Sequence, residues 1–206
     1  MRKIRMYTGI VAGTAPVVGI KDGNIIRSLI MNLDGYLDDL KIGASVALDG
    51  VCMTVVSIEE NHVKFDAIEE TLTRTTLGNL EIGSMVNIER SLKMGDELGG
   101  HLISGHVLRT AKIVSREERG EGVDFLIENS IETRPYILQK GFIAIDGMSL
   151  TIGEITDEYF SLHIIPETLR VTTISDKKIG DKVNIEIDSR TQILVDTIRK
   201  SMEVKK

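Results

Sequence analysis

The feature that most constrains this chain is an internal duplication. When the sequence is shifted by 97 positions against itself, residues 49–89 align with residues 146–186 without a gap, and 16 of the 41 pairs are identical. A shift of 96 also pairs Gly9-Ile10-Val11 with Gly105-His106-Val107. A period of this length is too long for a solenoid repeat. The sequence therefore predicts two homologous domains in tandem.

Each copy has the pattern of several short strands joined by polar turns. In the first copy, residues 52–58 are rich in β-branched side chains, and residues 63–67 and 86–89 alternate between apolar and polar. The polar residues 59–62 form the expected turn between two of these strands. Many short strands favour a small closed or nearly closed barrel, which leaves no long free edge. We therefore expect an all-β fold of two tandem barrels.

The last segment of the chain has a different pattern. Leu194, Val195, Ile198 and Met202 recur at helical spacing, and Lys and Arg fill the last turns. Such an amphipathic helix can dock on its own domain or pack against copies of itself, and the sequence alone favours docking. The expected division of the chain is residues 1–101, 102–189 and 190–206.

Composition argues against several classes of partner. The net charge is −6, and no Lys/Arg cluster is interleaved with aromatic residues, so nucleic acid is not an expected partner. Cys52 is the single cysteine, which excludes an intrachain disulfide. The charged N-terminus has no apolar stretch behind it, and no apolar run approaches 18 residues. These features predict a cytoplasmic protein that does not bind a membrane.

Common catalytic signatures are absent from the sequence, which has no Walker loop, zinc-ligand spacing or G-x-S-x-G elbow. The densest Gly/His region is Gly99-Gly100-His101 followed by Gly105-His106. Its ordinary interpretation is a linker and a first strand with a satisfied histidine. The duplication favours a further role for His106, because the first copy has the apolar Ile10 at that position.

Two more positions leave both interpretations open. Cys52 pairs with Ser149 in the other copy, and it is either a buried small hydrophobe or a polarizable group that faces a ligand. Thr54 and Thr151 are hydroxyls within strand patterns, which strand propensity or a shared ligand contact could explain.

Five motifs in order give the chain a resemblance to a known family. They are residues 7–11 (YTGIV), 50–55 (GVCMTV), 104–106 (SGH), 147–151 (GMSLT) and 165–169 (IPETL). On these motifs the chain resembles riboflavin synthase of the alpha type over nearly its whole length. The resemblance implies two tandem six-stranded barrels and a C-terminal helix, assembled as a homotrimer through the helices. It also suggests lumazine synthase as a protein partner.

The resemblance implies a reaction as well. In the family, two molecules of 6,7-dimethyl-8-ribityllumazine exchange a four-carbon unit, which gives riboflavin and 5-amino-6-ribitylaminouracil with no cofactor and no metal. Each barrel binds one lumazine, and the active site forms where the N-terminal barrel of one subunit faces the C-terminal barrel of its neighbour. Two homologous pockets would hold identical donor and acceptor together, which lowers the entropic cost of their encounter.

The family's site residues carry over by position. The expected catalytic residues are His106, a proton carrier of the type that titrates near neutrality, with Ser45 and Cys52, which bind or deliver the attacking group. The expected ligand contacts are Gly9, Ile10, Val11, Cys52, Met53, Thr54, Asp66, Ala67, Ile68, Glu69, Glu70 and Thr71 in the first barrel, and Gly105, His106, Val107, Lys140, Ser149, Leu150, Thr151, His163, Ile164, Ile165, Pro166, Glu167 and Thr168 in the second. Lys140 matches a position that reaches the neighbouring subunit's ligand, although without the family it would be interpreted as a solvated lysine.

The chain departs from the family at its start. The family usually begins Met-Phe-Thr-Gly-Ile-Val, whereas here Tyr7 replaces the phenylalanine and five residues precede Met6. A tyrosine keeps the ring and adds a hydroxyl that needs a partner if it is buried. Two competing interpretations remain: a non-catalytic lumazine- or flavin-binding antenna protein of the same fold, and an unrelated β-barrel interaction module.

Overall fold

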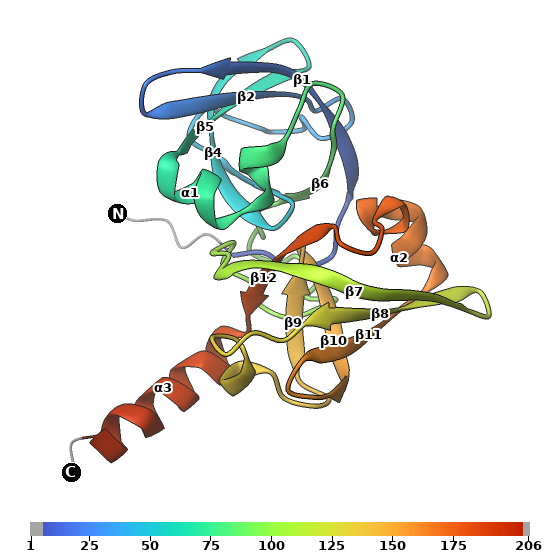
Figure 1. The fold of residues 1–206 in the computed structure, drawn as a ribbon. Coiled ribbons are helices and arrows are strands. Elements are labelled where there is room, and N and C mark those ends of the chain that lie inside the picture. Colours follow the sequence, from blue (N-terminus) through green and yellow to red (C-terminus); the bar gives the residue numbers. More distant parts are fainter. Residues whose placement is uncertain (1–5, 204–206) are drawn as a thin grey trace.

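The computed structural model describes residues 6–203, which form two barrels stacked one on the other and a helix that extends away from the second barrel (Figure 1). The expected fold of two tandem six-stranded barrels with a C-terminal helix is confirmed. The N-terminal extension before Met6 and the last three residues lie outside the described range. Within residues 6–203, no helix combines the length and apolar character that a membrane crossing requires.

The first barrel closes in the strand order β1-β2-β5-β4-β3-β6, and all of its strand pairs are antiparallel. Its elements are β1 (Gly13–Asp22), β2 (Ile26–Asn32), β3 (Ser45–Leu48), β4 (Val51–Glu59), β5 (His62–Ile68), α1 (Glu69–Arg74), η1 (Thr76–Asn79) and β6 (Met85–Arg90). The strands expected from alternation in the first copy are therefore present.

The second barrel repeats the same order with six added to each strand number, β7-β8-β11-β10-β9-β12. Its elements are β7 (Arg109–Arg119), β8 (Gly122–Glu128), η2 (Arg134–Tyr136), β9 (Phe142–Ile145), β10 (Met148–Ile155), β11 (Tyr159–Ile164), α2 (Pro166–Val171), η3 (Thr173–Asp176) and β12 (Lys182–Ile187). The duplication seen in the sequence is thus a duplication of the whole barrel.

Alternation along the strands separates a core face from an outer face. On β3 and β4, Val46 pairs with Met53 and both side chains lie in the first barrel's core. Ser45 pairs with Thr54 and Ala47 pairs with Cys52, so these side chains lie on the opposite, outer face. The predicted reactive groups therefore point away from the core.

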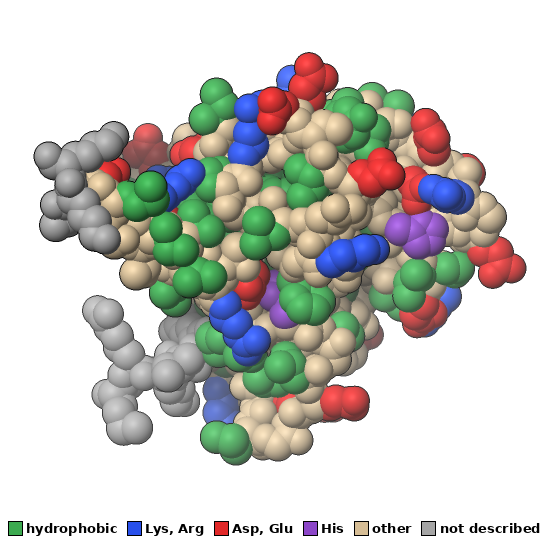
Figure 2. All heavy atoms as spheres, turned by 90° about the horizontal axis from the view of Figure 1, so that it is seen from below, with side chains coloured by type: hydrophobic (Ala, Val, Ile, Leu, Met, Phe, Trp, Pro, Cys, Tyr) green, Lys and Arg blue, Asp and Glu red, His purple; other side chains and the backbone are tan. Residues whose placement is uncertain are grey.

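Helix α3 (Ser189–Glu203) begins one residue before the expected boundary. The Tyr136 hydroxyl donates to Asp196 Oδ1 at 2.7 Å, and Arg199 lies over the Tyr136 ring, so the helix contacts its own barrel through η2. Its apolar stripe is not covered: Leu194 is 61% exposed and Met202 is 65% exposed. Figure 2 views the molecule from the side of this helix and shows hydrophobic side chains gathered on that surface.

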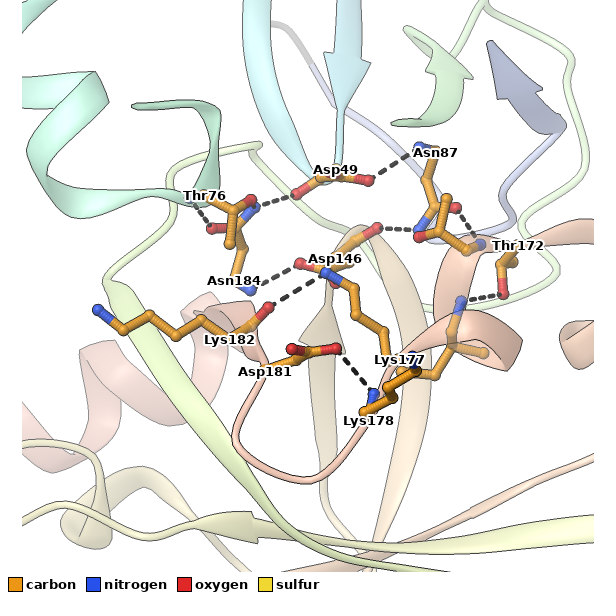
Figure 3. Close-up of polar contacts among 12 residues, drawn as sticks. Asp49, Thr76, Asn87, Asp146, Thr172, Lys177, Lys178, Asp181, Lys182 and Asn184 are labelled. Carbon is orange, nitrogen blue, oxygen red and sulfur yellow. Dashed lines mark hydrogen bonds and ion pairs between the residues drawn. The ribbon is translucent and has the colours of Figure 1, made fainter. Parts of the chain in front are cut away.

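Two asparagines join the barrels by reciprocal hydrogen bonds (Figure 3). Asn87 on β6 donates to the backbone oxygen of Asp146 at 3.0 Å and accepts from the Thr173 amide at 2.8 Å. Asn184 on β12 donates to the backbone oxygen of Asp49 at 2.8 Å and accepts from the Thr76 amide at 2.8 Å. The two halves of the chain thus meet about an approximate two-fold axis.

Two hairpin turns approach each other closely at the contact between the barrels, which we call the seam. Asp49-Gly50 and Asp146-Gly147 have positive φ at both residues, as tight hairpin turns require. A Cβ on Gly50 would lie 2.5 Å from the backbone nitrogen of Gly147, so glycine is needed for the contact as well as for the turn.

The seam encloses two carboxyl groups with one cation. Lys177 Nζ lies 3.5 Å from Asp146 Oδ2, whereas the first copy has Leu80 at the matching position. Burial, and secondarily the nearby Asp146 charge, raises the pKa of Asp49 to about 8. Of the two carboxyl groups, Asp146 forms the ion pair with Lys177, and Asp49 forms none with the described residues.

We expect stability to depend on pH through Asp49. The folded chain keeps a proton that the unfolded chain releases above about pH 4, so stability should fall as the pH rises from about 4 to about 8. Asp49→Asn keeps an oxygen acceptor for the Asn87 amide, which donates to Asp49 Oδ1 at 2.8 Å, and it carries no charge. Between pH 4 and pH 8 the unfolding free energy of Asp49→Asn should fall less than that of the parent protein, and the difference between the two falls should be about 1 kcal/mol or more.

Urea unfolding at several pH values measures this difference. Asp34→Asn, a change at an exposed aspartate, is the control and should follow the parent protein. Parallel curves for Asp49→Asn and the parent would contradict the expectation.

Candidate active site

Two segments cross between the barrels before each barrel begins. Tyr7 and Ile103 pair through two backbone hydrogen bonds of 2.8 and 3.0 Å. Just beyond them, the Gly9 oxygen accepts from the Ser149 amide in the second barrel, and the Gly105 oxygen accepts from the Cys52 amide in the first. Each crossing segment therefore contributes to the barrel formed by the other half of the chain.

This crossing changes where some predicted contacts lie. Gly9, Ile10 and Val11 were expected in the first barrel's pocket, but Gly9 lies against Ser149 and Val11 packs in the core of the second barrel. Gly105, His106 and Val107 were expected to open the second barrel, but Val107 packs against the core of the first. Strand patterns carry no information on which barrel a preceding segment joins, so the sequence could not reveal the crossing.

A buried glutamate holds each crossing segment. Glu89 accepts from the amide and hydroxyl of Thr8 at 2.6 and 2.8 Å and from the Gly9 amide at 3.1 Å. Glu186 accepts in the same way from Ser104 and from the Gly105 amide. Burial raises the pKa of both glutamates, and the donated hydrogen bonds oppose that rise.

The first barrel's outer face brings the three predicted catalytic residues into one region. Cys52 and Ser45 share the outer face of β3 and β4. A Cβ on Gly105 would lie 2.5 Å from the Cys52 Cβ, so the backbone leading into His106 passes directly over Cys52. The His106 side chain lines a hollow of about 510 Å³ together with Glu70, another predicted contact.

The crossing segments make twin hollows of different chemistry. Ile10, the counterpart of His106, is exposed and lines a smaller hollow of about 380 Å³ beside Glu89. His106 lines its own hollow beside Glu186. The imidazole of His106 thus has an apolar side chain, Ile10, at the equivalent position in the other hollow, as the sequence comparison indicated.

The second barrel has the largest hollow described here, of about 920 Å³, over β7, β8, β10 and β11. Seven predicted contacts line it: Lys140, Ser149, Leu150, Thr151, His163, Ile165 and Thr168. All of its lining residues lie between Ser115 and Thr168, so the first barrel of the same chain contributes none.

Three of the titratable groups at this hollow, Arg119, Asp124 and His163, contact one another. His163 Nδ1 contacts Asp124 Oδ1, and Arg119 Nη1 lies 2.8 Å from Asp124 Oδ2. The hydrogen bond from Arg119, and then that from His163, holds the pKa of Asp124 below its usual value. At the same ladder position in the first barrel, Asp66 accepts a hydrogen bond of 2.7 Å from Ser28.

Several predicted contacts have side chains that face elsewhere. Met53, Ala67 and Ile164 are buried in the barrel cores, so only their backbone can face a ligand. The remaining predicted contacts lie on β4, at the end of β5, or in α1 and α2, namely Thr54, Ile68, Glu69, Thr71, Pro166 and Glu167. Of these, Glu167 forms an exposed ion pair with Arg170 at 2.6 Å.

Sequence reasoning missed one residue beside the second hollow. His101 is 8% exposed, its Nδ1 lies 2.6 Å from Ser149 Oγ, and its ring stacks on Phe142. Burial lowers the pKa of His101, which favours the neutral imidazole. The dense Gly/His region was visible in the sequence, but its contact with Ser149 depends on the crossing chain and has no local signal.

Comparison with known proteins agrees with this geometry. The model of the lumazine binding domain family matches the chain twice, over residues 8–91 and 104–188. The solved structure of LumP in complex with riboflavin superposes with a TM-score of 0.81 at 26% identity and covers 89% of this chain and all of that one. LumP in complex with 6,7-dimethyl-8-(1'-D-ribityl) lumazine, at 23% identity and a TM-score of 0.80, shows the likeness of fold alone.

Curated relatives are closer in sequence. Riboflavin synthase of Escherichia coli K12 is 49% identical over 198 residues, which cover 95% of this chain and 92% of that protein. Riboflavin synthase of Chlamydia pneumoniae is 43% identical over 95% of this chain and 96% of that protein. With both halves matched and the identity sustained over nearly the full length, the chain belongs to the riboflavin synthase family and is an enzyme.

Proposed function

We propose that each barrel of this chain binds one molecule of 6,7-dimethyl-8-ribityllumazine, and that the first barrel of one subunit and the second barrel of another form the active site. The family's reaction transfers four carbons from one lumazine to the other and gives riboflavin and 5-amino-6-ribitylaminouracil. Its atoms balance without an oxidant or reductant. The observation that carries the proposal is the pair of homologous outer faces with different reactive groups, Cys52 and His106 on one and Ser149 on the other.

The second hollow has the size and polarity that such a ligand needs. A volume of about 920 Å³ lies within the range of small-molecule sites. Leu150 and Ile165 supply apolar surface for a ring system, while Ser149, Thr151 and Thr168 supply hydroxyls. These groups are suited to a flat heterocycle that carries a polyol chain.

The absence of first-barrel residues from this hollow supports a site between subunits. A reaction between two lumazines needs both reacting rings in contact, and the second hollow is built from its own barrel only. The exposed apolar stripe of α3 provides a surface by which copies of the chain can associate. We therefore include the homotrimer in the proposal. A cytoplasmic location and a complex with lumazine synthase stay predictions.

In this proposal, His106 moves a proton at the first barrel. The reaction removes a proton from the methyl group on C7 of one lumazine and adds a nucleophile to C7 of the other. The His106 side chain lines an open hollow beside Glu70 and Ser104, within reach of solvent and of a bound ring. Ser45 and Cys52 lie on the neighbouring outer face, where they can bind or deliver the attacking group.

The direct test uses the purified chain and 6,7-dimethyl-8-ribityllumazine alone. We expect riboflavin absorbance to rise without any added cofactor, and calorimetric titration with a non-reacting lumazine analogue to give two binding events per chain. Tight binding without turnover would favour the antenna protein instead. The 49% identity to a riboflavin synthase, against 26% to LumP, supports the enzyme.

His106→Gln should slow turnover while it leaves lumazine binding nearly intact. Loss of a general acid–base group lowers the rate by about 10²-fold or more, while the amide keeps a polar side chain of similar size. Steady-state kinetics and titration on the same preparation separate the two effects. His62→Gln, on the exposed start of β5, is the matched control. An equal loss of rate and affinity would mean that the histidine is structural.

Deletion of residues 190–206 should yield monomers with little activity, because it removes the apolar stripe of α3 and leaves both barrels intact. Light scattering coupled to size-exclusion chromatography measures the mass, and the riboflavin assay measures activity. Lys200→Ala changes the helix without altering an apolar side chain and should stay assembled. A truncated chain that remains trimeric and active would remove the helix from the assembly.

A further inference from the structure

His101 lies in the linker between the barrels and contacts a residue of the second hollow. Its side chain is 8% exposed, and its Nδ1 lies 2.6 Å from Ser149 Oγ. Ser149 is half-buried and lines the hollow of about 920 Å³ that is proposed above for a lumazine. His101 is not among the residues that line this hollow, so it acts on a ligand there through Ser149.

We infer that His101 is a positioning residue, which fixes the Ser149 hydroxyl in the direction that a lumazine bound to the second barrel needs. The inference rests on the proposed function, because it requires a lumazine in this hollow. A serine side chain turns between three staggered rotamers when nothing holds it. A hydrogen bond to a fixed imidazole selects one of them, so the hydroxyl is oriented before the ligand binds.

The imidazole is itself fixed by packing. The His101 ring stacks on the Phe142 ring with centroids 5.3 Å apart and planes 17° apart. Phe142 lies on β9 and pairs with Thr151 on β10, the strand that also carries Ser149. Burial lowers the pKa of His101 and thus favours the neutral ring. Either neutral tautomer can bond the serine, because Nδ1 donates or accepts and the hydroxyl does the reverse.

The rest of Ser149 is held by the segments that cross it. Its amide donates to the Gly9 oxygen at 2.8 Å, which fixes the backbone. A Cβ on Gly100 would lie 2.7 Å from the Ser149 Cβ, so the linker packs directly on the serine just before it reaches His101. Rotation of the hydroxyl group about the Cα–Cβ bond is the freedom that remains, and the contact with His101 restricts it.

The first barrel has a different neighbour at the equivalent position. Cys52 aligns with Ser149, and its Sγ accepts a hydrogen bond of 3.1 Å from the Tyr7 hydroxyl. The twin positions therefore contact a phenol in one barrel and an imidazole in the other. Because His101 contacts the residue of the second barrel, a change at His101 should alter one of the two lumazine sites.

Two substitutions separate the hydrogen bond from the ring packing. His101→Phe keeps a ring that can stack on Phe142 and loses Nδ1, whereas His101→Asn loses the ring and keeps a polar atom bonded to Cγ, where Nδ1 was. In calorimetric titration with a non-reacting lumazine analogue, His101→Phe should weaken one of the two binding events about threefold to tenfold, as expected for one hydrogen bond. His101→Asn should recover most of that affinity. His62→Asn, on the exposed start of β5, is the control and should keep both events.

A double substitution tests whether His101 acts through Ser149. Ser149→Ala should weaken the same binding event, and His101→Phe should have no further effect in that background. The inference would be overturned if His101→Phe left both events unchanged, if His101→Asn bound no better than His101→Phe, or if His101→Phe had an equal effect in both backgrounds.

A second measurement keeps His101 intact. In protein labelled with ¹⁵N-histidine, Ser149→Ala should shift the Nδ1 resonance of His101 and leave that of His62 in place; an unmoved His101 resonance would also overturn the inference. A parent protein with fewer than two binding events would refute the proposed function. Two events that His101→Phe leaves unchanged would refute the positioning role and leave the proposed function standing.

Discussion

The reciprocal bonds of Asn87 and Asn184 are the interaction on which the rest of the structure depends. Each amide reaches across the seam, donates to a turn carbonyl of the other barrel and accepts from the backbone of its 3-10 segment. All of these groups are buried, so loss of one amide would leave several backbone groups without partners. The bonds hold the two barrels against each other, and across the same contact the crossing segments reach Cys52 and Ser149.

The two copies are nearly identical where they meet and different where they face a ligand. Asp, Gly, Asn and Glu recur at the seam and at the anchors of the crossing segments. On the outer faces, Cys52 aligns with Ser149, and Asp66 aligns with His163. A symmetric frame therefore carries an asymmetric pair of pockets, which is what a reaction between two copies of one substrate requires.

Local patterns were sufficient for much of the fold and for part of the site. The duplication predicted two equal barrels, and alternation over residues 63–67 and 86–89 located β5 and β6. The resemblance named Cys52 and His106 as site residues, but it did not reveal the chain crossing that brings the backbone leading into His106 over Cys52. The contact of His101 with Ser149 could not be predicted, because His101 lies in a linker with no strand or helix pattern and its partner is 48 residues away.

The departure at Tyr7 shows both sides of this limit. The chemistry of the residue indicated that a buried hydroxyl would need a partner, and the structure supplies the sulfur of Cys52, 45 residues away. Which atom would accept the hydrogen bond depended on the barrel packing, which the sequence does not encode locally.

The exchange of Gly9–Val11 and Gly105–Val107 has a consequence for the history of the chain. A single barrel separated from its twin would lose the crossing segment that covers its outer face. The core of the second barrel would lose Val11, and the core of the first would lose its contact with Val107. A half-length ancestor could restore these contacts only as a dimer in which each copy places its N-terminal segment on the barrel of the other. Gene fusion would then have joined in one chain two halves that already exchanged these segments as separate subunits.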